Sequence, residues 1–183
     1  YKRIGDNMIY YDTHAHYNDE KFNGIVEKTL NDCMSVGVKY INNIGYNLES
    51  SRCAVELSNE YKECYAVIGI HPSDVGKCSV DEIEELYKNF NNGKIVAIGE
   101  IGLDYYWVKD NKEEQKKLFI EQIELANKLK LPIVVHSRDA SLDTYLILKE
   151  HPAKYGTLLH CFSPTEDLVR LVIENNYTVA FCG

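Results

Sequence analysis

The sequence predicts an α/β fold of the (β/α)8 TIM-barrel type, and three observations support this prediction. Short apolar runs alternate with longer amphipathic stretches along the whole chain. Several short runs are continuously apolar, which is typical of parallel strands buried on both faces. Histidines and acidic residues follow many of these runs. Strand ends at opposite edges of a flat sheet lie far apart, whereas a barrel gathers them around one mouth. A barrel is therefore the better explanation than an open doubly wound sheet.

Seven apolar runs predict the strands in chain order. They cover residues 8–11, 40–44, 65–70, 95–98, 133–135, 157–159 and 177–181. The longer stretches between them predict six helices, at residues 20–36, 49–62, 79–91, 112–130 and 141–150 and from Ser163 onward. Strict alternation of strand and helix implies parallel strands that are joined by right-handed crossovers.

Two of the predicted helices begin with a capping pattern. Ser79 is followed three residues later by Glu82, which is the pattern of a capping box. Ser163 precedes Pro164 and Glu166, so we expect Ser163 to cap the last helix with the proline in its first position. Ser163 is a better cap than a nucleophile, because no base is spaced to serve it.

The composition excludes several classes of protein. With 45% apolar and 26% charged residues, the chain is neither disordered, collagenous nor a coiled coil. No apolar run approaches the roughly 18 residues of a membrane helix. The net charge of −8 weighs against a passive nucleic-acid binder, although bound metal ions can supply positive charge locally.

The cysteines indicate a reducing compartment. None of the six forms a C-x-x-C pair, and all lie in apolar or helical stretches. We therefore expect free, mostly buried thiols and a cytoplasmic or nuclear location, with disulfides as the less favoured alternative.

Five of the six histidines lie at the C-terminal ends of predicted strands. His14 and His16 are two residues apart, so on an extended chain both imidazoles point to the same side and can hold one cation. Alternatively, they are two solvated histidines beside a turn. Glu100 follows an apolar strand, where an unpaired buried carboxylate is costly. It either forms an ion pair, for example with Arg138, or bridges two cations.

His136 and His160 end two further strands. Either histidine alone is more often a hydrogen-bonded core residue than a ligand. Four histidines and one carboxylate at matching strand ends, however, predict a binuclear metal site. Two metal ions about 4 Å apart can activate a water molecule for hydrolysis. Nitrogen ligands favour Zn or Mn over Mg, although this preference is weak when a carboxylate bridges.

Five segments along the whole chain resemble the TatD family of metal-dependent deoxyribonucleases. They are D-T-H-A-H at 12–16, G-I-H-P at 69–72, G-E-I-G-L-D-Y at 99–105, P-I-V-V-H-S-R-D-A at 132–140 and L-H-C-F-S at 159–163. The resemblance implies a hydrolase that cleaves phosphodiester bonds of DNA from an end, with two divalent ions (Mg, Mn or Zn). His14 and His16 would hold one ion and His136 and His160 the other, with Glu100 as the bridge.

The resemblance also implies how the substrate is held. His71 and Arg138 match positions that face the substrate phosphate, and with Glu100 they make up the expected catalytic set. An arginine fork suits a pair of phosphate oxygens, but Arg138 could instead pair with Glu100 or Asp139. Asp104 is expected either among the substrate-binding residues or as support for a ligand. The expected partner is DNA, with no membrane and no obligate protein partner.

The chain departs from the family pattern at its C-terminal end. Members of the family continue past the seventh strand and carry a metal-binding aspartate on strand eight, and a (β/α)8 barrel usually takes about 250 residues. We therefore expect one metal-hydrolase barrel domain over residues 1–183, without strand eight and its flanking helices, and able to self-associate through its open edges. Two alternatives remain open: a metal amidohydrolase or deaminase acting on a small molecule, and an inactive associating fragment.

Overall fold

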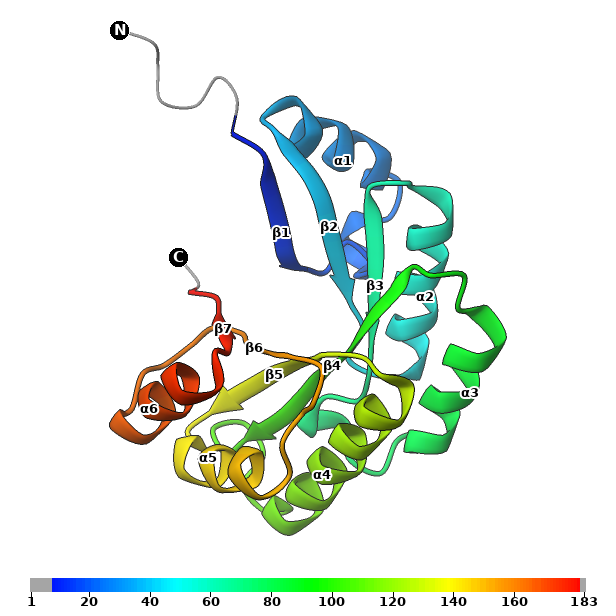
Figure 1. Ribbon diagram of the computed structural model, residues 1–183. Coiled ribbons are helices and arrows are strands. Elements are labelled where there is room, and N and C mark those ends of the chain that lie inside the picture. Colours follow the sequence, from blue (N-terminus) through cyan, green and yellow to red (C-terminus); the bar gives the residue numbers. More distant parts are fainter. Residues whose placement is uncertain (1–7, 182–183) are drawn as a thin grey trace, which may run out of the picture.

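Seven parallel strands form a single curled sheet in the computed structural model, which describes residues 8–181 (Figure 1). The strands are β1 (Tyr10–Ala15), β2 (Val38–Ile44), β3 (Cys64–Ile68), β4 (Ile95–Asp104), β5 (Ile133–Arg138), β6 (Thr157–Leu159) and β7 (Thr178–Val179). They pair in chain order, so β1 and β7 are the two edges of the sheet. This topology confirms the predicted α/β class of barrel type, and it places every strand's C-terminal end on the same side.

Six α-helices connect the strands and lie along the outer side of the curled sheet (Figure 1). They are α1 (Val26–Ser35), α2 (Leu48–Glu60), α3 (Val80–Phe90), α4 (Lys112–Leu129), α5 (Ser141–Glu150) and α6 (Glu166–Asn175). Two short 3-10 helices, η1 (Glu20–Phe22) and η2 (Pro72–Asp74), follow β1 and β3. Within the described part of the chain, none of these helices is long and apolar enough to cross a membrane.

Three strands extend past their predicted C-terminal ends. β1 continues through His14, β4 continues to Asp104 and β5 continues to Arg138. The side chains of His14, Glu100 and His136 therefore lie within strands rather than after them. The predicted end of β4 at residue 98 lies just before the first of its two glycines, Gly99. The second, Gly102, has a φ of 136°, and a side chain there would collide with the backbone carbonyl of His136 on β5. The close approach of the two strands therefore requires glycine at this position.

The structure confirms one predicted helix cap and corrects another. The side chain of Ser79 accepts from the backbone N–H of Glu82, as the capping box predicts. The prediction that Ser163 caps the last helix is wrong, because α6 begins at Glu166 and Thr165 is its cap. Ser79 and Ser163 are each followed by a glutamate three residues later, so this local pattern does not distinguish the residue that caps a helix from the one that does not. The path of the chain into the helix makes the difference. The predicted helix at 20–36 is also divided into η1 and α1.

The core has two sides. The larger cluster packs the helices against the outer face of the sheet, and Phe119 and Ile123 of α4 are fully buried in it. A separate cluster on the other face takes one residue from each of four neighbouring strands: Ile44, Val67, Ala97 and Val134. Side chains alternate between the faces of a strand, and those on the inner face form layers in a barrel. This inner layer supports the site described next.

The described cysteines are all free thiols: Cys33, Cys53, Cys64, Cys78 and Cys161. Only Cys64 is fully buried, so the expectation of mostly buried thiols is too strong. Cys182, the sixth cysteine, lies outside the described residues.

Candidate metal centre

The strand ends bring four of the five predicted ligands to one cavity and place the fifth, His14, against Glu100. His14 lies on β1, Glu100 on β4 and His136 on β5, while His16 and His160 directly follow β1 and β6. The cavity has a volume of about 680 Å³, and its lining includes His16, Glu100, His136 and His160. The curl of the sheet thus places together residues that are up to 146 positions apart in the sequence (160 − 14).

Glu100 is at the centre of this cluster and is only 5% exposed. One carboxylate oxygen, Oε2, lies 3.4 Å from Nε2 of His14 and 3.9 Å from Nε2 of His16. The other oxygen, Oε1, lies 2.9 Å from Nδ1 of His136. The two oxygens therefore face two different sets of histidines, which is the arrangement that a bridging carboxylate requires.

His16 presents an unprotonated nitrogen to the cluster. Its Nδ1 lies 3.1 Å from the backbone carbonyl oxygen of Ile44, which can only accept a hydrogen bond. In the neutral ring the proton is therefore on Nδ1, and Nε2 carries a lone pair. This Nε2 lies 3.2 Å from Nε2 of His14. A hydrogen bond from the second nitrogen to a carbonyl is the usual way in which a metal-binding histidine is oriented.

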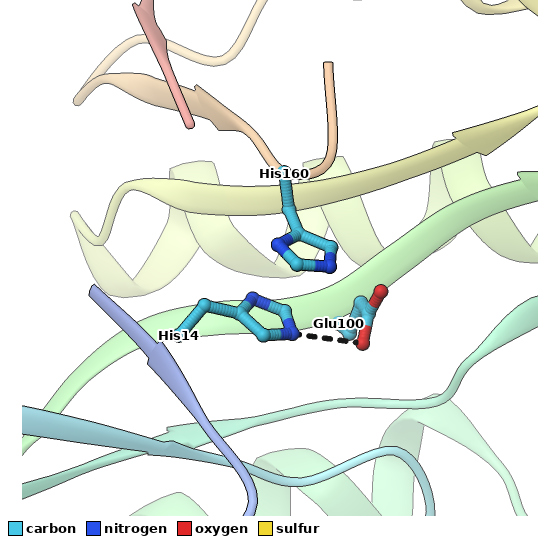
Figure 2. Close-up of side chains that lie close together, drawn as sticks. All are labelled: His14, Glu100 and His160. Atoms are coloured by element: carbon cyan, nitrogen blue, oxygen red, sulfur yellow. Dashed lines mark ion pairs between the residues drawn. The ribbon is translucent and has the colours of Figure 1, made fainter. Parts of the chain in front are cut away.

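His14 and His160 stack face to face, with ring centroids 3.4 Å apart and planes inclined by 8° (Figure 2). The Nδ1 atoms of both rings are buried and have no hydrogen-bond partner within residues 8–181. Buried polar atoms are rarely left unpaired in proteins. His14, Glu100 and His160 each offer a ligand atom, and these atoms lie within 4.8 Å of one another. The donor set fits a divalent cation that binds imidazole nitrogen and carboxylate oxygen.

His71, Glu100 and His136 form a second group whose ligand atoms lie within 4.8 Å of one another. Nε2 of His136 lies 3.0 Å from Oδ2 of Asp104. Asp104 is 1% exposed, so it is placed to orient His136 rather than to contact a bulky substrate. The resemblance paired His136 with His160 around one ion. The structure instead groups His160 with His14 and groups His136 with His71.

Burial and charge set the protonation of the site. Burial alone would raise the pKa of Glu100, but hydrogen bonds from His136 and His14 hold it well below the usual value. Burial, together with a neighbouring histidine, lowers the pKa of His71 and of His160 to about 4. Burial would also lower the pKa of His136, but Glu100 and Asp104 raise it. The low pKa values of Glu100 and His160 favour the charged carboxylate and the neutral imidazole that bind a metal, whereas the raised pKa of His136 favours a proton that a metal ion would have to displace.

Arg138 ends β5 beside this cluster, and its side chain is exposed. Among the described residues it forms no ion pair, with Glu100, Asp139 or any other acid, within 4.0 Å. Its guanidinium lies instead 4.4 Å from the ring centroid of Tyr106 and 5.4 Å from that of Trp107. The N–H groups of Arg138 are therefore free for an anion.

Two buried glutamines of α4 position the strand ends, and the sequence analysis missed both. Gln122 accepts from the backbone N–H of Ile70 at 2.8 Å and donates to its carbonyl at 2.9 Å, next to His71. Gln115 makes the same pair of contacts with the backbone of Asp104, at 2.8 and 3.1 Å. The two glutamines are seven residues apart, on the helix face that also carries Phe119. The sequence signal that could have revealed them is the presence of two glutamines on the apolar face of a predicted helix.

Comparison with known proteins gives one family and several longer relatives. The family model "TatD related DNase" matches residues 11–183. The chain is 36% identical over 174 residues to the metal-dependent hydrolase YabD of Bacillus subtilis, covering 94% of this chain and 68% of YabD. It is 29% identical over 151 residues to the 3'-5' ssDNA/RNA exonuclease TatD of Salmonella typhimurium, covering 81% of this chain and 58% of TatD.

A solved structure gives the same picture. The crystal structure of YjjV, a TatD homologue from Escherichia coli, has a TM-score of 0.83 and 30% identity, covering 93% of this chain and 66% of YjjV. The chain thus spans about two thirds of the length of YabD and YjjV.

Proposed function

Since the chain belongs to the TatD family of related DNases, we propose that it forms the metal centre of a hydrolase that cleaves phosphodiester bonds of DNA with two divalent ions. The two oxygens of Glu100, which face His14 and His16 on one side and His136 on the other, are the observation that supports this proposal most strongly. Contact with two cations would offset the free-energy cost of burying the charged carboxylate of Glu100.

The proposed ligands follow from the tautomers and contacts of the histidines. His14, His16 and His160 would hold one ion with Glu100, and Nδ1 of His136 would hold the second ion with the other oxygen of Glu100. When bound, the ions lower the pKa of a water molecule and polarise a phosphate oxygen. Asp104 keeps the ring of His136 in place, since it accepts a hydrogen bond from Nε2.

His71 is proposed as a hydrogen-bond donor to the substrate phosphate. Its Nδ1 accepts from the backbone N–H of Ser73 at 3.1 Å, so the neutral ring carries its proton on Nε2. A protonated Nε2 can donate to an oxygen but cannot bind a metal ion. Arg138 supplies a second, charged donor, because no acidic residue of the described chain engages its N–H groups. The substrate phosphate would thus lie between His71, Arg138 and the ions.

DNA is proposed as the substrate, cut from an end, and the name of the Salmonella relative supports single-stranded nucleic acid in general. The test is release of nucleotides from a single-stranded oligodeoxynucleotide by the chelator-treated chain, with and without added Mg²⁺, Mn²⁺ or Zn²⁺. We expect release with metal and none without it. Glu100→Gln should abolish release, and Glu124→Gln, at an exposed position on α4, is the matched control.

Three results would contradict the proposal: release without metal, release by Glu100→Gln at saturating metal, or no release under any condition. Hydrolysis of a small amide or amine in place of DNA would favour the amidohydrolase alternative.

A further inference from the structure

An exposed aromatic pair lies at the mouth of the cavity. β4 ends at Asp104, and the chain continues as Tyr105-Tyr106-Trp107. Trp107 is the only tryptophan of the chain and is 69% exposed, while Tyr106 is 45% exposed. Exposed indole is unfavourable in water, and tryptophan is enriched where a partner covers it. The ring of Trp107 therefore offers a free apolar face beside the metal centre.

The aromatic pair lies against Arg138, which is the only lysine or arginine among the described residues that line the cavity. The rings of Tyr106 and Trp107 are perpendicular, with centroids 4.7 Å apart, and the Arg138 guanidinium lies over both. Cation–π contacts orient the guanidinium without occupying its N–H groups. Proteins that bind single-stranded nucleic acid combine the same two elements, aromatic faces for the bases and positive charge for the phosphates.

Asp104 connects the aromatic pair to the metal centre. Its Oδ1 accepts from the backbone N–H groups of Tyr106 at 3.0 Å and of Trp107 at 2.8 Å. Its Oδ2 contacts Nε2 of His136 at 3.0 Å. One buried carboxylate thus fixes both the turn that presents Trp107 and a proposed metal ligand. Trp107, Arg138 and His136 line the same cavity, so one ligand can contact all three.

We propose that Trp107 is a stacking platform for a nucleobase of a single-stranded nucleic acid, a specificity that rests on the proposed phosphodiester hydrolysis. The base would lie on the indole while its adjoining phosphate contacts Arg138 and the metal centre. A base in a duplex has both faces covered by its neighbours, so only a single strand or a frayed end presents a free face. The platform therefore selects unpaired ends.

Intrinsic fluorescence tests the platform directly, because all tryptophan emission comes from Trp107. The probes are a short oligothymidylate with phosphorothioate linkages and an abasic oligomer of equal length and charge, each titrated in the presence of Mg²⁺. We expect saturable quenching by the oligothymidylate and little change with the abasic oligomer. Equal responses to the two oligomers, or no response to the oligothymidylate up to millimolar concentration, would overturn the proposal.

Kinetics provide the second test, with cleavable versions of the same oligomers. The quantity is the ratio of kcat/KM for oligothymidylate to kcat/KM for the abasic oligomer. Loss of one stacked base should lower this ratio by about 5- to 100-fold in Trp107→Ala. Trp107→Phe should retain part of the preference. Tyr155→Ala is the matched control, since Tyr155 is also an exposed aromatic residue, at 45%, but precedes β6, at the opposite end of the sheet.

The outcomes separate the two proposals. Base-dependent quenching without any cleavage would contradict the hydrolysis and leave the platform standing. Cleavage with the same ratio in the wild type and Trp107→Ala would contradict the platform and leave the hydrolysis standing.

Discussion

The Nε2 atoms of His14 and His16 lie 3.2 Å apart, and both face the same oxygen of Glu100. The contact of His16 with the carbonyl of Ile44 fixes a lone pair on its Nε2. A shared cation would engage both Nε2 atoms and the carboxylate together, which is why the cluster is better explained as a metal centre than as a hydrogen-bonded core.

Arg138→Ala should impair catalysis without destabilising the protein. Loss of a charge-assisted hydrogen bond to phosphate should lower kcat/KM by about 10- to 100-fold. Because Arg138 pairs with no acid in the described chain, its removal strands no buried charge, and the thermal melt should not move. A clear fall in Tm would show that Arg138 has a structural role. Arg170→Ala, at an exposed residue of α6, is the control for loss of one positive charge.

Asp104→Asn should weaken metal binding. The amide oxygen can still accept from the backbone of Tyr106 and Trp107, but the amide nitrogen is a donor and cannot accept from His136. Loss of such an orienting partner usually costs about 10- to 100-fold in metal affinity. Calorimetric titration with Zn²⁺ or Mn²⁺ would measure it, with Asp110→Asn, an exposed site, as the control. Unchanged affinity would mean that Asp104 does not support a ligand.

Gln122→Leu should lower the free energy of unfolding by about 2–5 kcal/mol, because it leaves the buried N–H and C=O of Ile70 without partners. Urea unfolding would measure the change. Glu124→Leu places the same side chain at an exposed position of the same helix and should have little effect. Equal stability of the two variants would refute the structural role of Gln122.

Local patterns predicted much of this protein. The order of strands and helices follows from hydrophobic periodicity, and each histidine was placed at a strand end from the apolar run directly before it. Both predictions depend on residues that are near in sequence. The capping box of Ser79 was predictable for the same reason.

Contacts between distant segments could not be predicted in this way. β4 extends to Asp104 because β5 provides backbone partners alongside it, as in the pairing of Asp104 with Arg138. The pairing of Gln122 with Ile70 joins residues 52 positions apart. The stacking of His14 on His160 depends on the curl of the whole sheet. The sequence predicted that the site residues meet at the mouth of the barrel, but it did not predict which of them contact one another.

Metal stoichiometry tests the central claim most directly. The chain is saturated with Zn²⁺ or Mn²⁺, dialysed free of excess ion and analysed by elemental mass spectrometry, beside Glu100→Gln and the exposed control Glu124→Gln. The bridging role of Glu100 predicts two ions per chain in the wild type and the control, and fewer in Glu100→Gln, because an amide cannot neutralise two cations. Fewer than two ions in the wild type, or two ions retained by Glu100→Gln with unchanged affinity, would contradict it.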